Sequence, residues 1–182
     1  MFEPKPHSSL GMKAARFVTV GLRRHTLIGL LVLVALALPM YATAGDQAQV
    51  PLKGSETGTF QLLGPCETGG IVLDVTGSGH ATFLGSYSSH YRECFDPATG
   101  AVIGGSFTLT AGNGDRLFGT YSGQAFPTGE SNVLYDDPGV IKGGTGRFAG
   151  ASGVVTQSGL ANLATGEYEG TLTGSVSSPG SA

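Results

Sequence analysis

One glycine-rich stretch, GGTGRFAGASG at residues 143–153, does more than any other to decide the fold of this chain. Five of its eleven residues are glycine, and it joins two segments whose composition favours β-strands. It is not a phosphate-binding loop, because no Lys-Ser or Lys-Thr pair follows the glycines and no helix is predicted after them. It also occurs only once, which excludes a repeated calcium-binding β-roll. We therefore interpret the stretch as a structural corner between two strands.

Each residue of this corner has an expected structural role. Gly143 and Gly144 would end one strand with a positive φ, which glycine adopts without strain. Phe148 would plug one end of a barrel, and the later glycines would let the next strand start against close neighbours. The residues of this predicted motif are Gly143, Gly144, Gly146, Phe148, Gly150 and Gly153.

Outward from this corner, the chain is rich in Thr, Val, Tyr, Phe and Ser between glycines, and no segment has apolar residues at helical spacing. Short turns such as Asn113-Gly114-Asp115 separate the strands, and strands joined by short hairpins are antiparallel. The predicted strands are residues 57–63, 70–76, 80–94, 101–111, 116–126, 131–142, 151–158 and 167–176. The fold class is therefore all-β.

Alternation along these strands repeatedly places aromatic residues and glycines on one face. Such a face suits the inside of a small barrel, because a glycine leaves room for a large neighbour. We expect an eight-stranded antiparallel closed barrel, whose interior is either filled by side chains or holds one small ligand. A two-sheet sandwich is the alternative architecture. The candidate residues that line the barrel and bind a ligand are Phe83, Tyr87, Tyr121 and Tyr168.

The first 44 residues have the layout of a secretory signal peptide. Basic residues precede an uncharged run from Leu27 to Met40, and Ala42-Thr43-Ala44 follows it. The run is short for a permanent membrane helix, so no stable anchor is expected after cleavage. The predicted organisation is a signal peptide at 1–44, an N-terminal extension at 45–56, a β-barrel domain at 57–176 and a disordered tail at 177–182. Export to the periplasm or the extracellular space follows from this prediction.

The part after residue 44 is acidic. It contains all but one of the 13 acids and half of the ten Lys and Arg residues, which disfavours nucleic acid as a partner. In an oxidising compartment its two cysteines, Cys66 and Cys94, are expected to form a disulfide. Together with His80 and His90 they could in principle bind zinc, but the spacing fits no compact zinc motif. We predict neither a metal site nor a cofactor.

The residues of the corner resemble a signature of plant dirigent proteins and of plant allene oxide cyclases. Residues 107–123 look like the central hairpin of small bacterial secreted proteins of the allene oxide cyclase-like superfamily, and residues 81–85 look like another of their segments. The resemblance covers roughly residues 79–176 and implies an eight-stranded antiparallel barrel. It also implies a possible homo-oligomer, because the related plant barrels form dimers or trimers. Residues 57–75 do not match the cyclases, so no catalytic residue is carried over.

No conventional catalytic constellation is visible in the sequence. His80 is the best single candidate for acid–base work. Asp136-Asp137 could bind calcium, but Asp-Asp-Pro-Gly is also a typical turn sequence, and a turn is the interpretation we adopt. The leading hypothesis is a non-enzymatic exported barrel that binds a small apolar or aromatic molecule or assembles with itself. The alternatives are a cyclase or isomerase that acts on a lipid-like substrate in the barrel, and a purely structural surface protein.

Overall fold

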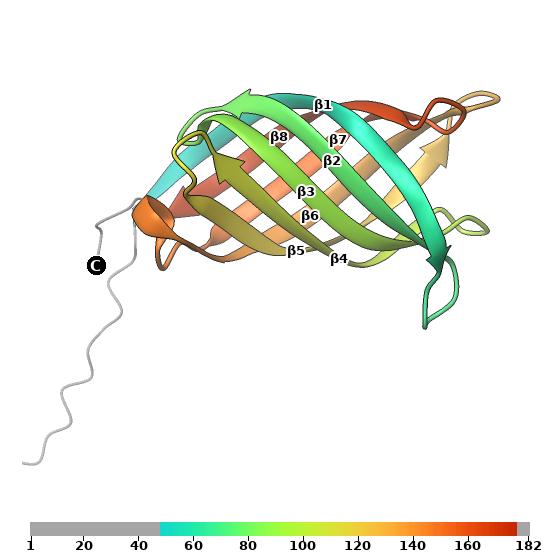
Figure 1. Ribbon diagram of the computed structural model, residues 1–182, viewed down its shortest axis with the longest axis horizontal. Coiled ribbons are helices and arrows are strands. Elements are labelled where there is room, and N and C mark those ends of the chain that lie inside the picture. The colour runs from blue at the N-terminus through green and yellow to red at the C-terminus, as the bar shows by residue number, and fades with distance from the viewer. Residues whose placement is uncertain (1–47, 178–182) are drawn as a thin grey trace, which may run out of the picture. The chain divides into compact units, whose positions relative to one another are not determined.

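The computed structural model describes residues 48–177, which form a closed barrel of eight antiparallel strands in chain order. Figure 1 shows the strands winding obliquely around the barrel. The predicted fold class and strand order are confirmed. The elements are β1 (Gln49–Pro65), β2 (Ile71–Ala81), β3 (Gly85–Asp96), β4 (Ala101–Ala111), β5 (Arg116–Pro127), β6 (Asn132–Gly144), a 3-10 turn η1 (Gly146–Phe148), β7 (Gly153–Asn162) and β8 (Glu167–Ser177).

The barrel closes because β1 pairs with both of its neighbours. Its register with β8 runs from Gln49 opposite Ser177 to Thr59 opposite Glu167, and its register with β2 begins at Gly54. β1 therefore starts earlier than the sequence predicts, and residues 49–56 belong to the barrel instead of an extension. This segment contains Pro51 and Gly54, which are uncommon in strands, so its pairing with β8 and not its composition identifies it as β.

A turn at residues 82–84 divides the predicted strand 80–94 between β2 and β3. Phe83 adopts a φ of 71°, a value uncommon for residues other than glycine, so composition does not reveal the turn. The Thr82 hydroxyl donates a 2.9 Å hydrogen bond to the Pro51 carbonyl and accepts one of 2.9 Å from the Lys53 amide. These bonds to β1 hold the turn in place.

One end of the barrel is filled by Phe148, which is 1% exposed. Its ring lies 5.1 Å from that of Phe83, measured between centroids, and the Arg147 guanidinium carbon lies 4.6 Å from its centroid. An Arg147 Nη2–H also donates a 2.9 Å hydrogen bond to the Leu84 carbonyl, which anchors the plug to the opposite turn. The other largest fully buried side chains are Leu52, Leu84, Leu109, Leu117, Leu172 and Val176. We call the end of the barrel that Phe148 fills the closed end.

The glycines of the corner act in two different ways. Gly146 and Gly150 have φ values of 56° and 76°, which glycine adopts without strain. Gly143 and Gly144 are not among the residues with positive φ, so their predicted conformation is wrong. They are required for space instead: a Cβ at Gly144 would lie 2.5 Å from the Cβ of Phe148, and one at Gly143 would lie 2.8 Å from the ring of the outward-facing Phe118.

Inside the barrel, aromatic rings lie over glycines of neighbouring strands. A Cβ at Gly105 would lie 2.5 Å from the ring of Tyr121, and one at Gly58 would lie 2.7 Å from that of Tyr168. Either contact is far too short for two carbon atoms, so a side chain at Gly58 or Gly105 would force the neighbouring tyrosine ring to move. The high glycine content of the chain thus makes room for a tyrosine-rich interior.

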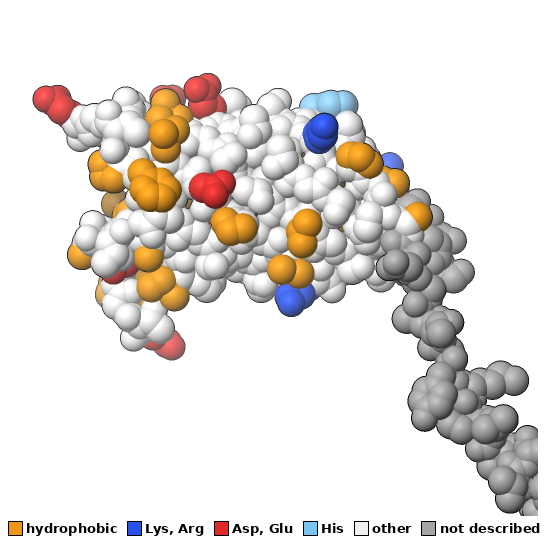
Figure 2. Space-filling view, turned by 180° about the vertical axis from the view of Figure 1, so that it is seen from behind, with side chains coloured by type: hydrophobic (Ala, Val, Ile, Leu, Met, Phe, Trp, Pro, Cys, Tyr) orange, Lys and Arg blue, Asp and Glu red, His pale blue; other side chains and the backbone are white. Residues whose placement is uncertain are grey.

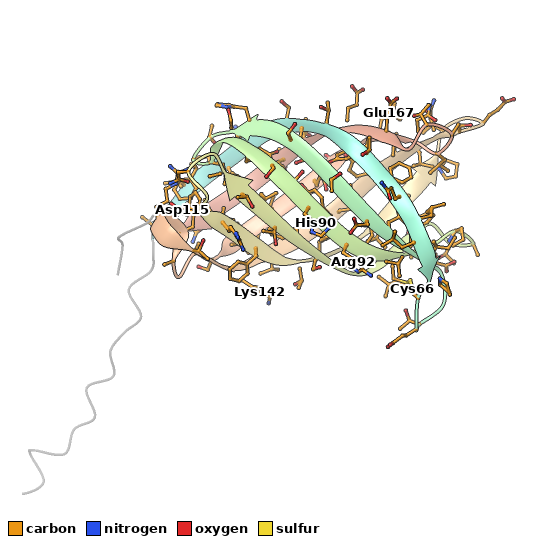
Figure 3. The ribbon with its side chains drawn as sticks, viewed as in Figure 1. Cys66, His90, Arg92, Asp115, Lys142 and Glu167 are labelled. Carbon is orange, nitrogen blue, oxygen red and sulfur yellow. A yellow bond between two sulfur atoms is a disulfide. The ribbon has the colours of Figure 1, made fainter. Side chains whose placement is uncertain are left out.

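Cys66, in the loop that follows β1, forms a disulfide with Cys94 of β3, as the sequence predicts. Figure 3 shows Cys66 at the end of the barrel opposite Asp115, which lies near the closed end. Within residues 48–177, no helix is long and apolar enough to span a bilayer. The predicted signal peptide at 1–44 and residues 178–182 of the predicted tail lie outside the described residues, whereas Ser177 is the last residue of β8.

Candidate ligand-binding cavity

A cavity of about 240 Å³ occupies the half of the barrel away from Phe148. Its wall is mostly apolar and includes Phe60, Leu73, Val75, Phe95, Val133 and Ala161. Leu62 and Leu163 line it near the connecting loops and are 62% and 53% exposed, so it reaches the rim of the barrel. Figure 2 shows hydrophobic side chains gathered at this end, which is on the left in that view. We call it the open end.

Glu56 of β1 lies beneath the cavity and is only 3% exposed. Its carboxyl oxygens accept hydrogen bonds from the hydroxyls of Tyr87 (2.9 Å), Tyr91 (2.8 Å) and Tyr168 (3.1 Å). The side-chain amide of Gln157 donates a fourth hydrogen bond to it. Burial, followed by the Glu56 charge, raises the pKa of Tyr91 well above its ordinary value, so its hydroxyl remains a donor. The group forms a rigid polar floor that joins β1, β3, β7 and β8.

Glu93 of β3 lies in the cavity wall above this floor. Its carboxyl accepts a 2.5 Å hydrogen bond from the Tyr121 hydroxyl of β5. Burial raises the pKa of Glu93, and the hydrogen bond from Tyr121 lowers it in part. The ring of Tyr121 meets that of Tyr91 edge-on, with 6.0 Å between the centroids.

Asp137 of β6 also lines the cavity and is 7% exposed. Its Oδ1 atom is buried and has no hydrogen-bond partner among the described residues. Burial, then the charges of Glu93 and Asp136, raise the pKa of Asp137 to about 8. The missing side chain of Gly123 on β5 provides the space for this carboxyl, because a Cβ at Gly123 would overlap Oδ1. Asp137 is therefore a buried carboxyl in the cavity wall, with one oxygen packed against Gly123 and without a hydrogen-bond partner.

The four candidate ligand-binding residues lie at three different places in the barrel. Tyr121 and Tyr168 line the cavity, and Tyr87 lies beneath it against Glu56. Phe83 lies at the closed end against Phe148 and is not among the residues that line the cavity. Its position in a turn explains the difference, because the alternation that placed it inside assumes an uninterrupted strand.

The polar residues considered from the sequence are mostly on the outside. His80 is exposed, and His90 lies on the outer face of the barrel with its Nε2 2.8 Å from Asp74 Oδ1 (Figure 3). The expected turn at Asp136-Asp137 is wrong: β6 continues through it, with Asp137 opposite Gln157 of β7. Among the described residues, no group of three or more His, Cys, Asp and Glu side chains could hold a metal ion.

Three carboxyls of this site were not predicted as site residues: Glu56, which was not considered, Glu93, which was assigned to a solvated strand end, and Asp137, which was assigned to a turn. For Asp137 a signal was available, because Val133, Tyr135, Asp137 and Ile141 share one face at a spacing of two residues. The same spacing relates Glu93 to Tyr91. Glu56 preceded the first predicted strand, so no face could be assigned to it. Comparison of the chain with protein-family models, curated proteins and solved structures found no match.

Proposed function

We propose that this protein is an exported barrel that binds a small, largely apolar molecule in the cavity at its open end. The observation that carries this proposal is the cavity itself: an apolar wall that reaches the rim, with a few polar groups at its inner end. Ligand sites typically combine these two features, since apolar area supplies affinity and the polar groups orient the ligand.

The size of the cavity limits the ligand. Its volume of about 240 Å³ is below the roughly 300–1,000 Å³ of pockets for drug-sized molecules. A single aromatic ring system or a short alkyl chain is the expected size, with any longer part extending past Leu62 and Leu163. The buried floor around Glu56 limits deeper entry, because four hydrogen bonds hold its side chains together across the barrel.

Export and family membership are parts of the same proposal. The basic and apolar layout of residues 1–44 supports export, and the Cys66–Cys94 disulfide is compatible with an oxidising compartment. The glycine-rich corner resembles a sequence signature of the allene oxide cyclase and dirigent superfamily, and this resemblance supports membership of it.

A cyclase or isomerase that acts on a lipid-like substrate is the second candidate function. It is favoured by Asp137, whose pKa of about 8 suits proton transfer near neutral pH, and which lies in the cavity. If this function holds, Asp137 would exchange a proton with a bound substrate. Isomerisation leaves the composition of the substrate unchanged, so the product would have the mass of the ligand.

Native mass spectrometry of the protein purified from its host tests the binding proposal. We expect a co-purified small molecule, and the same spectrum reports whether the chain assembles with itself. Titration with a neutral fluorescent naphthol provides a second measurement on ligand-free protein. Saturable binding is expected, at one site per chain.

A matched pair of variants locates the site. Val133→Phe places a ring in the cavity wall, whereas Leu134→Phe adds the same bulk to the next residue, which faces outward and is 49% exposed. Val133→Phe should weaken naphthol binding about tenfold or more, because a filled pocket rejects ligands by at least 1–3 kcal/mol. Leu134→Phe should leave the affinity within about twofold. Equal effects of the two variants, or no saturable binding to the native protein, would contradict the proposal.

A further inference from the structure

The inner end of the cavity is acidic and lacks a compensating positive charge. Glu93 and Asp137 both line it, and the floor beneath contributes a third carboxyl, Glu56. Among the residues of the cavity wall, none is Lys, Arg or His. All five Lys and Arg side chains within residues 48–177 are exposed, so the barrel keeps its positive charges away from this interior.

The three carboxyls differ in what they still can bind. Glu56 is occupied by four donors, and Glu93 by Tyr121. Asp137 alone has a buried oxygen without a partner, although its side chain is more than nine-tenths buried in the cavity wall. A void of about 10 Å³ beyond it is at the lower limit for one water molecule. Such a water would supply a hydrogen bond but no opposite charge.

The aromatic part of the wall favours the same kind of ligand group. Tyr91 and Tyr121 form one edge-to-face pair, and Tyr135 and Tyr168 form another, with 6.4 Å between the centroids of the second pair. All four tyrosines line the cavity together with the two carboxyls. Electron-rich rings around carboxyls are the surroundings in which proteins bind organic ammonium groups, since ring faces and carboxylates both attract positive charge.

We propose that the cavity binds an organic cation, an ammonium group on a small apolar body, with the ammonium at Asp137 and Glu93 and the apolar part along the wall toward the rim. This inference rests on the proposed binding function and names its ligand class. A carboxylate ligand would add a negative charge beside Asp137 and Glu93, and a neutral ligand would leave these carboxyls without a counter-charge whenever they are ionised. An ammonium group at this end of the cavity lies beside the carboxyls of both Asp137 and Glu93, which line it, and offsets both at once.

Three probes of equal chain length test the ligand class: octylamine, octan-1-ol and octanoate, each below the concentration at which it self-associates. Isothermal titration calorimetry at pH 8 on the purified protein should show octylamine binding about tenfold to a hundredfold more tightly than octan-1-ol, because hydrogen bonds to charged groups are the stronger ones. Octanoate should bind more weakly than octan-1-ol.

Two variants assign the preference to the carboxyls. Asp137→Asn should remove most of the amine advantage over the alcohol, and Glu93→Gln should reduce it independently. Asp136→Asn, which changes an exposed carboxyl outside the cavity wall, should leave the ratio within about twofold.

The outcomes distinguish this inference from the proposed function. If octan-1-ol binds but octylamine binds no more tightly, or if the advantage survives both cavity variants, the ligand class is wrong and the binding function stands. If none of the three probes binds, both are overturned. An amine advantage that Asp137→Asn and Glu93→Gln reduce and Asp136→Asn preserves supports both.

Discussion

Replacing Asp137 with Asn should stabilise this protein at alkaline pH, although the residue is buried. The folded barrel raises the pKa of Asp137 to about 8, from an ordinary value of 3.8, because burial and the charges of Glu93 and Asp136 disfavour its ionised form. Asn has nearly the shape of the protonated carboxyl, but it has no acidic proton and cannot ionise. The variant therefore keeps the packing of the neutral side chain at every pH.

The sign and size of the effect follow from proton linkage. Between pH 3.8 and about 8 the folded state keeps a proton on Asp137 that the unfolded state releases, so the free energy of unfolding falls as pH rises. Each pH unit in this window removes up to about 1.4 kcal/mol. The native protein therefore loses about 4–6 kcal/mol through Asp137 by pH 9, and the Asn variant does not. At pH 4 the two proteins should differ by about 1 kcal/mol or less.

Urea denaturation at pH 4, 6 and 9 measures this difference. The chain has no tryptophan, so circular dichroism and tyrosine fluorescence report unfolding. Asp136→Asn is the matched control: the side chain is exposed, and removing its charge should change the free energy of unfolding by no more than about 0.5 kcal/mol. A stability difference between native protein and Asp137→Asn that stays constant from pH 4 to pH 9 would refute the assignment of a raised pKa to this carboxyl.

Three further changes should reduce stability by amounts that the structure predicts. Replacing Cys66 and Cys94 with Ser should lower the free energy of unfolding by about 3 kcal/mol, which a urea titration of the oxidised protein and the double variant would measure. Phe148→Ala at the closed end should cost about 3–5 kcal/mol, whereas Phe118→Ala on the outer face should cost less than about 1 kcal/mol; equal losses would contradict the role of Phe148 as a plug. Glu56→Ala leaves three tyrosine hydroxyls without their acceptor, so thermal unfolding should show a loss of at least about 3 kcal/mol.

Much of the fold could be predicted because its signals are local. Turn residues such as Asn113-Gly114 separate the strands, and short connections make neighbouring strands antiparallel. The order of the eight strands follows from these two facts. The turn at Phe83 and the start of β1 were missed, because neither a positive φ at phenylalanine nor pairing with the distant strand β8 leaves a local trace.

The site could be predicted only in part. Alternation placed Tyr121 and Tyr168 on the inner face, and the structure has both in the cavity wall. It could not separate the two halves of the barrel, so Phe83 of the closed end appeared equivalent to them. The carboxyls of the site come from three separate strands, and no spacing along the chain relates Glu56 to Glu93 or Asp137.

The sequence by itself determined most of the strands, their antiparallel order and the position of the glycine-rich corner, because hairpins and alternation depend on neighbouring residues. It also determined the disulfide partners, because the chain has two cysteines. Only the tertiary structure decided that the barrel is filled at Phe148 and open at the other end, and that Asp137 lacks a partner in its cavity. The physical reason is closure. Joining β1 to β8 brings side chains that are far apart in the chain into one interior, where volume and solvation, and with them the pKa of each carboxyl, depend on the whole set at once.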